Sequence, residues 1–185
     1  MSSKKELRLR FRTHRMSMTP EHVQSRSQLI CTSLFNRIRK DDYQTIAIFL
    51  PIRTFNEPDI SPLLKQLQAG NIRMLLPIVD GLSLITVHYE EGMALKKSYG
   101  GTSIPETITL IDPSEAELVL VPMLAADKQG YRLGYGKGFY DRFLEDLKSE
   151  KWGICFDEEA IDELPFDVHD QKIDAIVTDK RFIWL

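Results

Sequence analysis

The sequence predicts a three-layer α/β fold in which helices cover both faces of a mostly parallel sheet. Short apolar runs rich in β-branched residues, such as Thr45–Leu50 and Leu118–Val121, alternate with segments of helical periodicity. This alternation is typical of parallel sheets buried on both faces. The chain has 185 residues, 43% of them hydrophobic and 28% charged, as in ordinary globular proteins. We expect a single domain over residues 1–185.

Two helices are expected at the start, over about residues 3–39, packed on the α/β core. The first, residues 3–16, places Leu7 and Phe11 one turn apart on one face. Thr19-Pro20-Glu21 then begins a new helix, because it combines a capping hydroxyl, a proline at the first helical position and an acid in the first turn. The second helix extends to about residue 39, and its inward face consists of Val23, Ile30, Leu34 and Ile38.

The remaining elements are short and alternate in type. After Thr45–Leu50 we expect a helix from Ser61-Pro62 to Gly70, strands at Ile72–Leu76, Leu82–Tyr89 and Leu118–Val121, a helix at Phe139–Leu147, and strands at Gly153–Phe156, Ala175–Thr178 and Phe182–Leu185. Glu90–Ile111 is the longest stretch without a regular pattern and is a candidate lid or substrate loop. Ligands of parallel sheets bind beyond the carboxyl ends of strands, and residues 50–57 and 121–138 are both expected to lie there.

The most informative segment leads from a strand through a glycine-rich loop into a helix, over Val121–Leu144. Its glycines let the backbone approach a ligand and expose N–H groups, and the positive end of the following helix faces the same way. The loop is neither a Walker A motif nor a dinucleotide fingerprint, because the glycine spacing differs and Phe139 stands where the fingerprint needs glycine. We interpret it as a polyphosphate site of another kind, with a glycine-rich structural turn as the alternative.

Charged residues in this loop indicate the chemistry. Lys137 can meet the β- or γ-phosphate of a nucleotide, and Arg132 can add a bidentate contact unless it forms a structural ion pair. Asp141 lies one turn into the helix, where a carboxylate either binds Mg²⁺ beside phosphates or complements the helix dipole.

Two further acids are candidates outside the loop. Asp170, beside His169, either supplies a second metal-side carboxylate or acid/base group, or belongs to a surface turn. Glu57 follows the first strand and either accepts hydrogen bonds from a heterocyclic substrate or is an ordinary loop acid. No spacing of Cys and His suits zinc, and no catalytic nucleophile arrangement is recognisable.

Charge is distributed unevenly along the chain. Residues 1–40 hold ten Lys and Arg against two Glu, a balance of +8, whereas the remainder has a balance of −11. Lys4, Arg8, Arg12 and Arg15 form a stripe along the first helix, which indicates either an anionic partner or a solvated face. Nucleic acid is a further candidate, although no nucleic-acid-binding signature accompanies the charge.

Features of targeting are absent from the sequence. No apolar run approaches the length of a membrane span, and the first residues lack the apolar core of a signal peptide. Cys31 and Cys155 are far apart, as expected of reduced thiols. We therefore expect a cytoplasmic protein.

The glycine loop resembles the signature of a known family. Arg132–Arg142, RLGYGKGFYDR, is similar to the R-L-G-x-G-x-G-Y-Y-D-R of 5-formyltetrahydrofolate cyclo-ligases, also called methenyltetrahydrofolate synthetases. The preceding VPMLAADKQG, the pair Lys4 and Arg8, and Pro165 with His169-Asp170 also fit the family in order. Phe139 replaces the usual tyrosine, and Tyr135 stands where some members carry arginine. The resemblance covers the whole chain and implies a fold similar to sugar-phosphate isomerase and CoA-transferase domains.

The resemblance also implies an activity and a set of site residues. The family converts 5-formyltetrahydrofolate and ATP to 5,10-methenyltetrahydrofolate, ADP and phosphate, with Mg²⁺. Lys137 and Arg132 would be catalytic, Asp141 and Asp170 would hold the metal, and the folate would contact Leu50, Glu57, Tyr135 and Phe139. ATP would contact Lys4, Arg8, Arg132, Leu133, Gly134, Tyr135, Gly136, Lys137, Gly138, Phe139 and Tyr140.

Other functions remain open at this point. The chain could be an ATP-using enzyme of the same scaffold that acts on another amide or heterocycle, a non-catalytic nucleotide- or folate-binding protein, or an RNA-binding module. We expect small-molecule substrates, neither a nucleic-acid nor a membrane partner, and a monomer or weak dimer.

Overall fold

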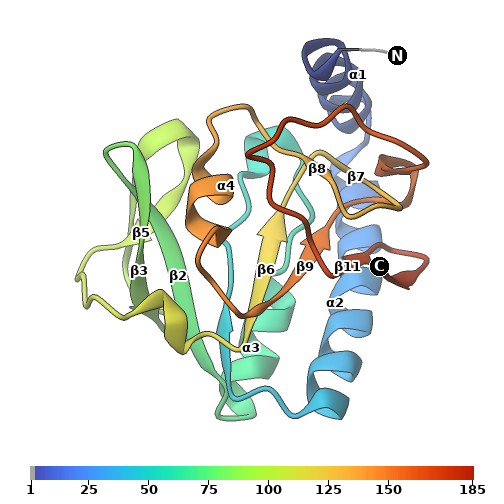
Figure 1. Ribbon diagram of the computed structural model, residues 1–185. Helices are drawn as coiled ribbons and strands as arrows, with labels where there is room; N and C mark the ends of the chain where they lie inside the picture. The colour runs from blue at the N-terminus through green and yellow to red at the C-terminus, as the bar shows by residue number, and fades with distance from the viewer. Residues whose placement is uncertain (1–2) are drawn as a thin grey trace.

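A seven-stranded sheet forms the middle layer of the protein (Figure 1), whose computed structural model describes residues 3–185. The strand order is β12-β11-β9-β6-β1-β2-β3. The five inner strands are parallel, and β12 and β3 pair antiparallel at the two edges. The strands are β1 (Thr45–Ala47), β2 (Arg73–Asp80), β3 (Ser83–Tyr89), β6 (Leu118–Pro122), β9 (Glu150–Ile154), β11 (Ala175–Val177) and β12 (Phe182–Trp184). The predicted mostly parallel α/β sheet is confirmed.

Helices cover both faces of this sheet, as the alternating pattern predicts. They are α1 (Lys4–Met16), α2 (Pro20–Asp41), α3 (Ser61–Ala69) and α4 (Phe139–Leu144). On one face, α2 and α3 bury a large core that includes Ile30, Leu64 and Trp152. On the other face, α4 contributes Leu144 to a second core, which also contains Val121 from β6.

The N-terminal helices begin where their capping signals indicate. The Ser3 side chain accepts a hydrogen bond from the Glu6 amide, and the Glu6 carboxylate accepts one from the Ser3 amide, which together form a capping box. Thr19 caps α2 by accepting from the His22 amide at 3.3 Å. Both boundaries are local events, so the sequence predicts them well.

Smaller elements depart from the expectation. Glu90–Ile111 contains a hairpin of β4 (Leu95–Lys97) and β5 (Ser103–Pro105), and a three-stranded sheet forms from β7 (Ala125–Asp127), β8 (Arg132–Leu133) and β10 (Ala160–Ile161). These strands are two or three residues long, too short to show a periodic pattern. Helix α4 ends three residues before the predicted Leu147, while β2 extends four residues beyond Leu76 to pair with β3 along its length.

The topology creates a crevice between β1 and β6. From β1 the chain crosses through α3 to β2 on one side, and from β6 it crosses through α4 to β9 on the other side. Neighbouring strands whose connections leave in opposite directions part at their carboxyl ends, which is where α/β proteins bind ligands. Helix α1 lies over this end of the sheet in Figure 1. None of the helices within residues 3–185 has the length and apolar character needed to cross a membrane.

Replacing Gly130 by alanine is expected to cost about 3 kcal/mol of stability. Gly130 has a φ of +88°, and an added Cβ would lie 2.9 Å from the carbonyl oxygen of Ile173. Gly81, in the turn between β2 and β3, is the matched control, because its φ is +59° and an added Cβ would meet nothing within 4 Å. Gly81→Ala should therefore cost only about 1 kcal/mol. Thermal unfolding of both variants measures the difference, and equal losses would contradict the steric argument.

Candidate active site

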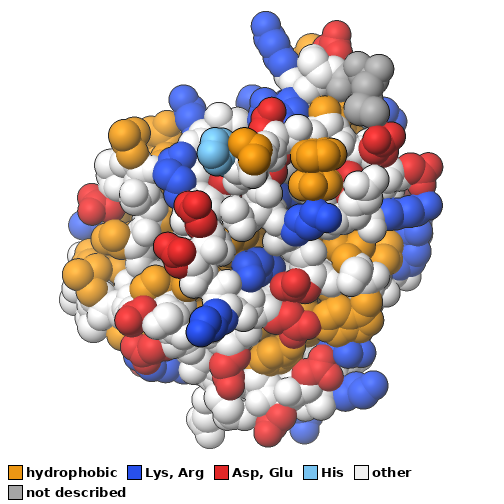
Figure 2. All heavy atoms as spheres, viewed as in Figure 1, with side chains coloured by type: hydrophobic (Ala, Val, Ile, Leu, Met, Phe, Trp, Pro, Cys, Tyr) orange, Lys and Arg blue, Asp and Glu red, His pale blue; other side chains and the backbone are white. Residues whose placement is uncertain are grey.

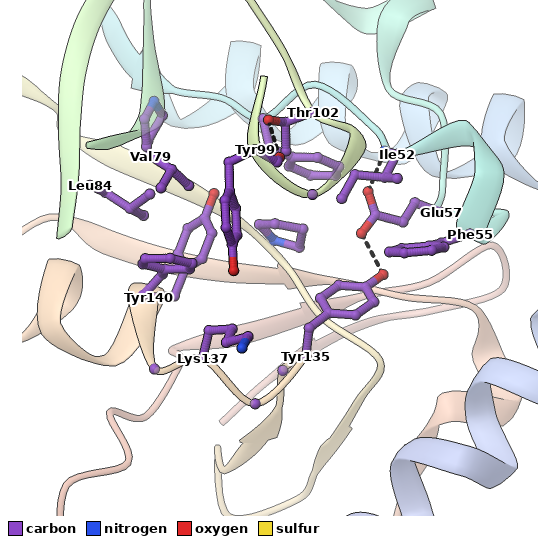
Figure 3. A pocket seen from close by; sticks show the side chains of 18 of the residues that line it. Ile52, Phe55, Glu57, Val79, Leu84, Tyr99, Thr102, Tyr135, Lys137 and Tyr140 are labelled. Atoms are coloured by element: carbon purple, nitrogen blue, oxygen red, sulfur yellow. Dashed lines mark hydrogen bonds between the residues drawn. The ribbon is translucent and has the colours of Figure 1, made fainter. Parts of the chain in front are cut away.

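A cleft of about 500 Å³ opens at the carboxyl ends of β1, β2 and β6. Residues 50–57 and the glycine loop both lie at the carboxyl ends of strands, as expected, and the structure brings them together in this one cleft. Helix α1 and the tip of the β4–β5 hairpin complete the walls. Figure 3 shows the cleft from close by, with Lys137 on one side and Glu57 and Tyr135 further along it.

The glycine loop forms a cationic end of the cleft. Gly136 and Gly138 have φ values of +92° and +67°, which favour glycine. The Arg8 Nε donates to the Gly134 carbonyl at 2.9 Å, and a Cβ on Gly136 would lie 3.1 Å from the Arg8 guanidinium carbon. Gly136 therefore lets α1 dock closely on the loop. Within residues 3–185, no carboxylate lies within ion-pair distance of the exposed Lys137 amine.

Three ion pairs lie at this end of the cleft. Lys4 contacts Asp167 at 2.6 Å and Asp170 at 2.5 Å. Partial burial acts to lower the pKa of Lys4, but the two carboxylates outweigh it and the pKa is raised. Arg132 pairs with Asp141 at 2.7 Å, so it forms the structural ion pair that was the alternative to a phosphate contact. The Arg132 side chain nevertheless also lines the cleft. Burial lowers the pKa of Arg132 and Asp141 opposes this shift.

The carboxylates of Asp141 and Asp170 both line this end of the cleft. Both lie near the Arg132 guanidinium group, because the negative charge of each carboxylate raises the pKa of Arg132. Among residues 3–185, no group of three or more His, Cys, Asp or Glu side chains is gathered closely enough to hold a metal ion. Two carboxylates without further ligands fit Mg²⁺ that shares phosphate oxygens and water, rather than an ion held by protein alone.

The other end of the cleft carries a buried carboxylate. Glu57 is 4% exposed, accepts a hydrogen bond from the Ile52 amide at 2.6 Å and accepts another from the Tyr135 hydroxyl. Burial raises the pKa of Glu57. Ile52 and Phe55 are the apolar residues on this side of the cleft, whereas Val79 and Leu84 lie on the far side of the Tyr99 ring in Figure 3. This end suits a flat organic group that has N–H donors.

Sequence reasoning missed the apolar wall from β2 and β3 and the contribution of Phe55. Val79 and Leu84 belong to strands whose alternating pattern explains their side chains without a ligand. Tyr99 at the hairpin tip packs edge-to-face on Phe139, with 5.8 Å between the ring centroids. In Figure 3 the Tyr99 ring extends from the hairpin toward Lys137. The candidate lid segment therefore reaches across the cleft to the glycine loop.

Leu133 is the predicted site residue that lies elsewhere. Leu133 does not line the cleft, because its side chain is buried with Leu7 and Phe11 under α1. Tyr135 points to Glu57, and its ring lies 5.7 Å from that of Phe55. It lines the cleft together with the other predicted site residues, namely Lys4, Arg8, Leu50, Glu57, Arg132, Gly134, Gly136, Lys137, Gly138, Phe139, Tyr140, Asp141 and Asp170.

The basic stripe of α1 is turned toward the protein. Lys4, Arg8 and Arg12 line the cleft, whereas Arg15 is 1% exposed and pairs with the buried Glu159 at 2.7 Å. Lys and Arg side chains are interspersed with Asp and Glu on the face seen in Figure 2. The solvated-face explanation therefore fails for most of the stripe.

The fold and the cleft first define a class of protein. It is an α/β protein whose cleft joins a cationic, glycine-rich end suited to phosphates with an apolar end that presents a carboxylate to an organic group. The chain belongs to the 5-formyltetrahydrofolate cyclo-ligase family, whose model matches residues 1–179.

Relatives and solved structures agree with this assignment. The 5-formyltetrahydrofolate cyclo-ligase of Escherichia coli is 26% identical over 181 residues, which cover 94% of this chain and 98% of that protein. The enzyme of the same name from Mycolicibacterium smegmatis is 33% identical over 76% of each chain. The structure of Aquifex aeolicus 5,10-methenyltetrahydrofolate synthetase superposes with a TM-score of 0.86 at 28% identity, covering 98% of this chain and 92% of that one. The synthetase from Mycoplasma pneumoniae gives a TM-score of 0.79 at 27% identity, with 96% and 99% covered.

Proposed function

We propose that this protein converts 5-formyltetrahydrofolate and ATP to 5,10-methenyltetrahydrofolate, ADP and phosphate. The observation that carries the proposal is that one cleft holds Lys137 on a glycine loop at one end and the buried Glu57 at the other. Membership of the cyclo-ligase family supports the same reaction.

The two ends of the cleft suit the two substrates. The ATP phosphates would lie on the glycine loop, where the amines and guanidinium groups of Lys137, Lys4 and Arg8 provide positive charge. The pterin ring would lie beside Phe55 and donate its N–H groups to Glu57. The formyl group would then lie between the two ends, near Tyr99 and Phe139, whose rings pack on each other.

The reaction needs activation of a poor electrophile. A formamide carbonyl resists attack, and its oxygen is a poor leaving group. Transfer of the γ-phosphoryl group to the formyl oxygen breaks the bond to ADP and makes an iminium-like phosphate ester. N10 then attacks the formyl carbon, phosphate leaves with its oxygen, and N10 loses its proton, which closes the five-membered methenyl ring. No enzyme nucleophile is required.

The protein's contribution is positioning and charge neutralisation. Lys137 would contact the transferring phosphoryl group, and the loop's backbone N–H groups would bind its oxygens. Arg132, fixed by Asp141, would supply positive charge from beneath the loop. Asp141 and Asp170 would hold Mg²⁺, which, when bound, offsets charge on the phosphates.

An absorbance assay tests the reaction directly. Purified protein with 5-formyltetrahydrofolate, ATP and Mg²⁺ is expected to produce the near-ultraviolet absorbance of the methenyl product, with one ADP and one phosphate formed per product. Omission of ATP is expected to abolish the signal. ADP formation without the methenyl product would indicate a different substrate, and ligand binding without either product would indicate a non-catalytic protein.

A further inference from the structure

A chain of hydrogen bonds runs from the buried end of α1 to the carboxylate in the cleft. Arg15 Nε and Nη2 donate to the two carboxylate oxygens of Glu159, each at 2.7 Å. Nη2 also donates to the Met123 carbonyl at 2.6 Å, and Nη1 donates to the Tyr135 hydroxyl oxygen at 3.1 Å. The Tyr135 hydroxyl in turn donates to Glu57 Oε1, which Figure 3 shows as a dashed line.

The direction of this chain follows from the chemistry of its first member. A guanidinium group can only donate, so the Tyr135 oxygen is the acceptor of the Arg15 bond. The single hydroxyl proton of Tyr135 is therefore left for Glu57. The Ile52 amide occupies the other carboxylate oxygen. The protein therefore supplies one hydrogen-bond donor to each carboxylate oxygen of Glu57. The remaining lone pairs of these oxygens are left for a ligand in the cleft.

We propose that Arg15 is a positioning residue that acts through Tyr135 to hold Glu57 as an ionised acceptor for the N–H groups of the pterin ring. The inference rests on the proposed function, because it takes the reduced folate as the ligand of Glu57. Neither Arg15 nor Glu159 lines the cleft, so neither is a catalytic residue. Their effect on the ligand passes through the tyrosine.

The ionised form of Glu57 needs this support because the site is buried. Burial raises the pKa of Glu57, and the Ile52 amide, the Tyr135 hydroxyl and the Arg15 charge lower it, while Glu159 raises it. Burial and, after it, the charge of Glu57 raise the pKa of Tyr140 on α4. Burial raises the pKa of Tyr135 well above its ordinary value, so its hydroxyl keeps the proton that it donates. Loss of that donor would raise the pKa of Glu57 further.

The predicted pH dependence has a definite sign. Ionised Glu57 accepts from the pterin, so affinity for the folate is full above the pKa of Glu57 and is lost as the pH falls through it. In Tyr135→Phe the same loss is expected at higher pH. The dissociation constant for 5-formyltetrahydrofolate, measured without ATP, should rise about tenfold near neutral pH, because one hydrogen bond to a charged group is removed. ATP affinity should change less than twofold.

Tyr131→Phe is the matched control for this variant. Tyr131 lies in the same segment, but its ring stacks on Phe166 away from the cleft. The control is expected to keep the wild-type affinity and pH profile. A profile for Tyr135→Phe that also coincides with wild type would overturn the inference.

The role of Arg15 is tested by removing its buried partner at the same time. Arg15→Met alone would leave Glu159 as an unpaired buried charge and could unfold the protein. The double variant Arg15→Met with Glu159→Gln avoids this penalty, and we expect it to fold. Its folate pH profile should shift upward by less than that of Tyr135→Phe, because the Tyr135 hydroxyl remains and the loss of the Glu159 charge offsets part of the loss of the Arg15 charge. A folded double variant with the wild-type profile would overturn the role of Arg15.

The outcomes also separate this inference from the proposed reaction. Wild-type protein that binds the folate with the predicted pH profile but forms no methenyl product would refute the reaction and leave the inference standing. Wild-type protein that forms product with a folate affinity that neither variant alters would refute the inference alone. Wild-type protein that does not bind the folate would refute both.

Discussion

Lys137→Ala is expected to lower kcat about a thousandfold, the largest effect of any single side chain in the cleft. The amine would lie against the phosphoryl group during transfer, when charge shifts toward the bridging oxygens. A positive charge in that place stabilises the transition state more than bound ATP, so kcat should fall more than the KM for ATP rises. Lys137 is exposed, and within residues 3–185 it has no ion-pair partner to leave unpaired. The variant should therefore remain folded.

Steady-state kinetics with both substrates measure this effect, and thermal unfolding verifies the fold. Lys128→Ala is the matched control, because Lys128 is an exposed residue that pairs with Asp162 at 2.6 Å outside the cleft. The control should retain wild-type kcat. A thousandfold loss confined to Lys137 supports transition-state contact, whereas a rise in the KM for ATP with unchanged kcat would limit its role to binding.

Glu57→Gln is expected to raise the KM for 5-formyltetrahydrofolate about a hundredfold. Glutamine replaces one carboxylate oxygen, a hydrogen-bond acceptor, with an NH₂ group, a donor. This NH₂ group cannot accept the hydrogen bond that a pterin N–H group would donate to Glu57. The KM for ATP should change little, because Glu57 lies apart from Lys137 in Figure 3, with Tyr135 between them. Glu163→Gln, which changes an exposed carboxylate, is the control. A wild-type folate KM in Glu57→Gln would contradict the proposed pterin contact.

The same variant is expected to be more stable than wild type at neutral pH. Burial raises the pKa of Glu57 above its value in the unfolded chain, so ionisation in the folded state has a cost at every pH above the unfolded pKa. Glutamine removes this cost, and the melting temperature should rise by a few degrees. The advantage should shrink as the pH falls below about 4, where the carboxyl is protonated in both states. A lower melting temperature at neutral pH would show that the hydrogen bonds to the carboxylate outweigh its burial.

Local signals determined much of this fold. The caps at Ser3 and Thr19 and the proline near the start of α3 act within one turn of helix, so their residues suffice to predict the boundaries. The glycine loop is similarly self-contained, since its positive φ values depend on glycine itself. The short strands outside the main sheet, such as β7 and β8, depend on distant partners and escaped prediction.

The sequence by itself determined the order of the helices and of the seven strands of the main sheet, the family resemblance, and a set of site residues of which all but Leu133 line the cleft. Only the tertiary structure decided what each side chain contacts. Tyr135 meets Glu57 across 78 positions, and Arg15 meets Glu159 across 144, so neither partner can be inferred from local spacing. Burial also changes what a charged side chain does. A charge that would be solvated on an isolated helix must form an ion pair or hydrogen bonds when it is buried inside the protein. The cationic stripe of α1 thus contributes three side chains to the cleft and one to its support.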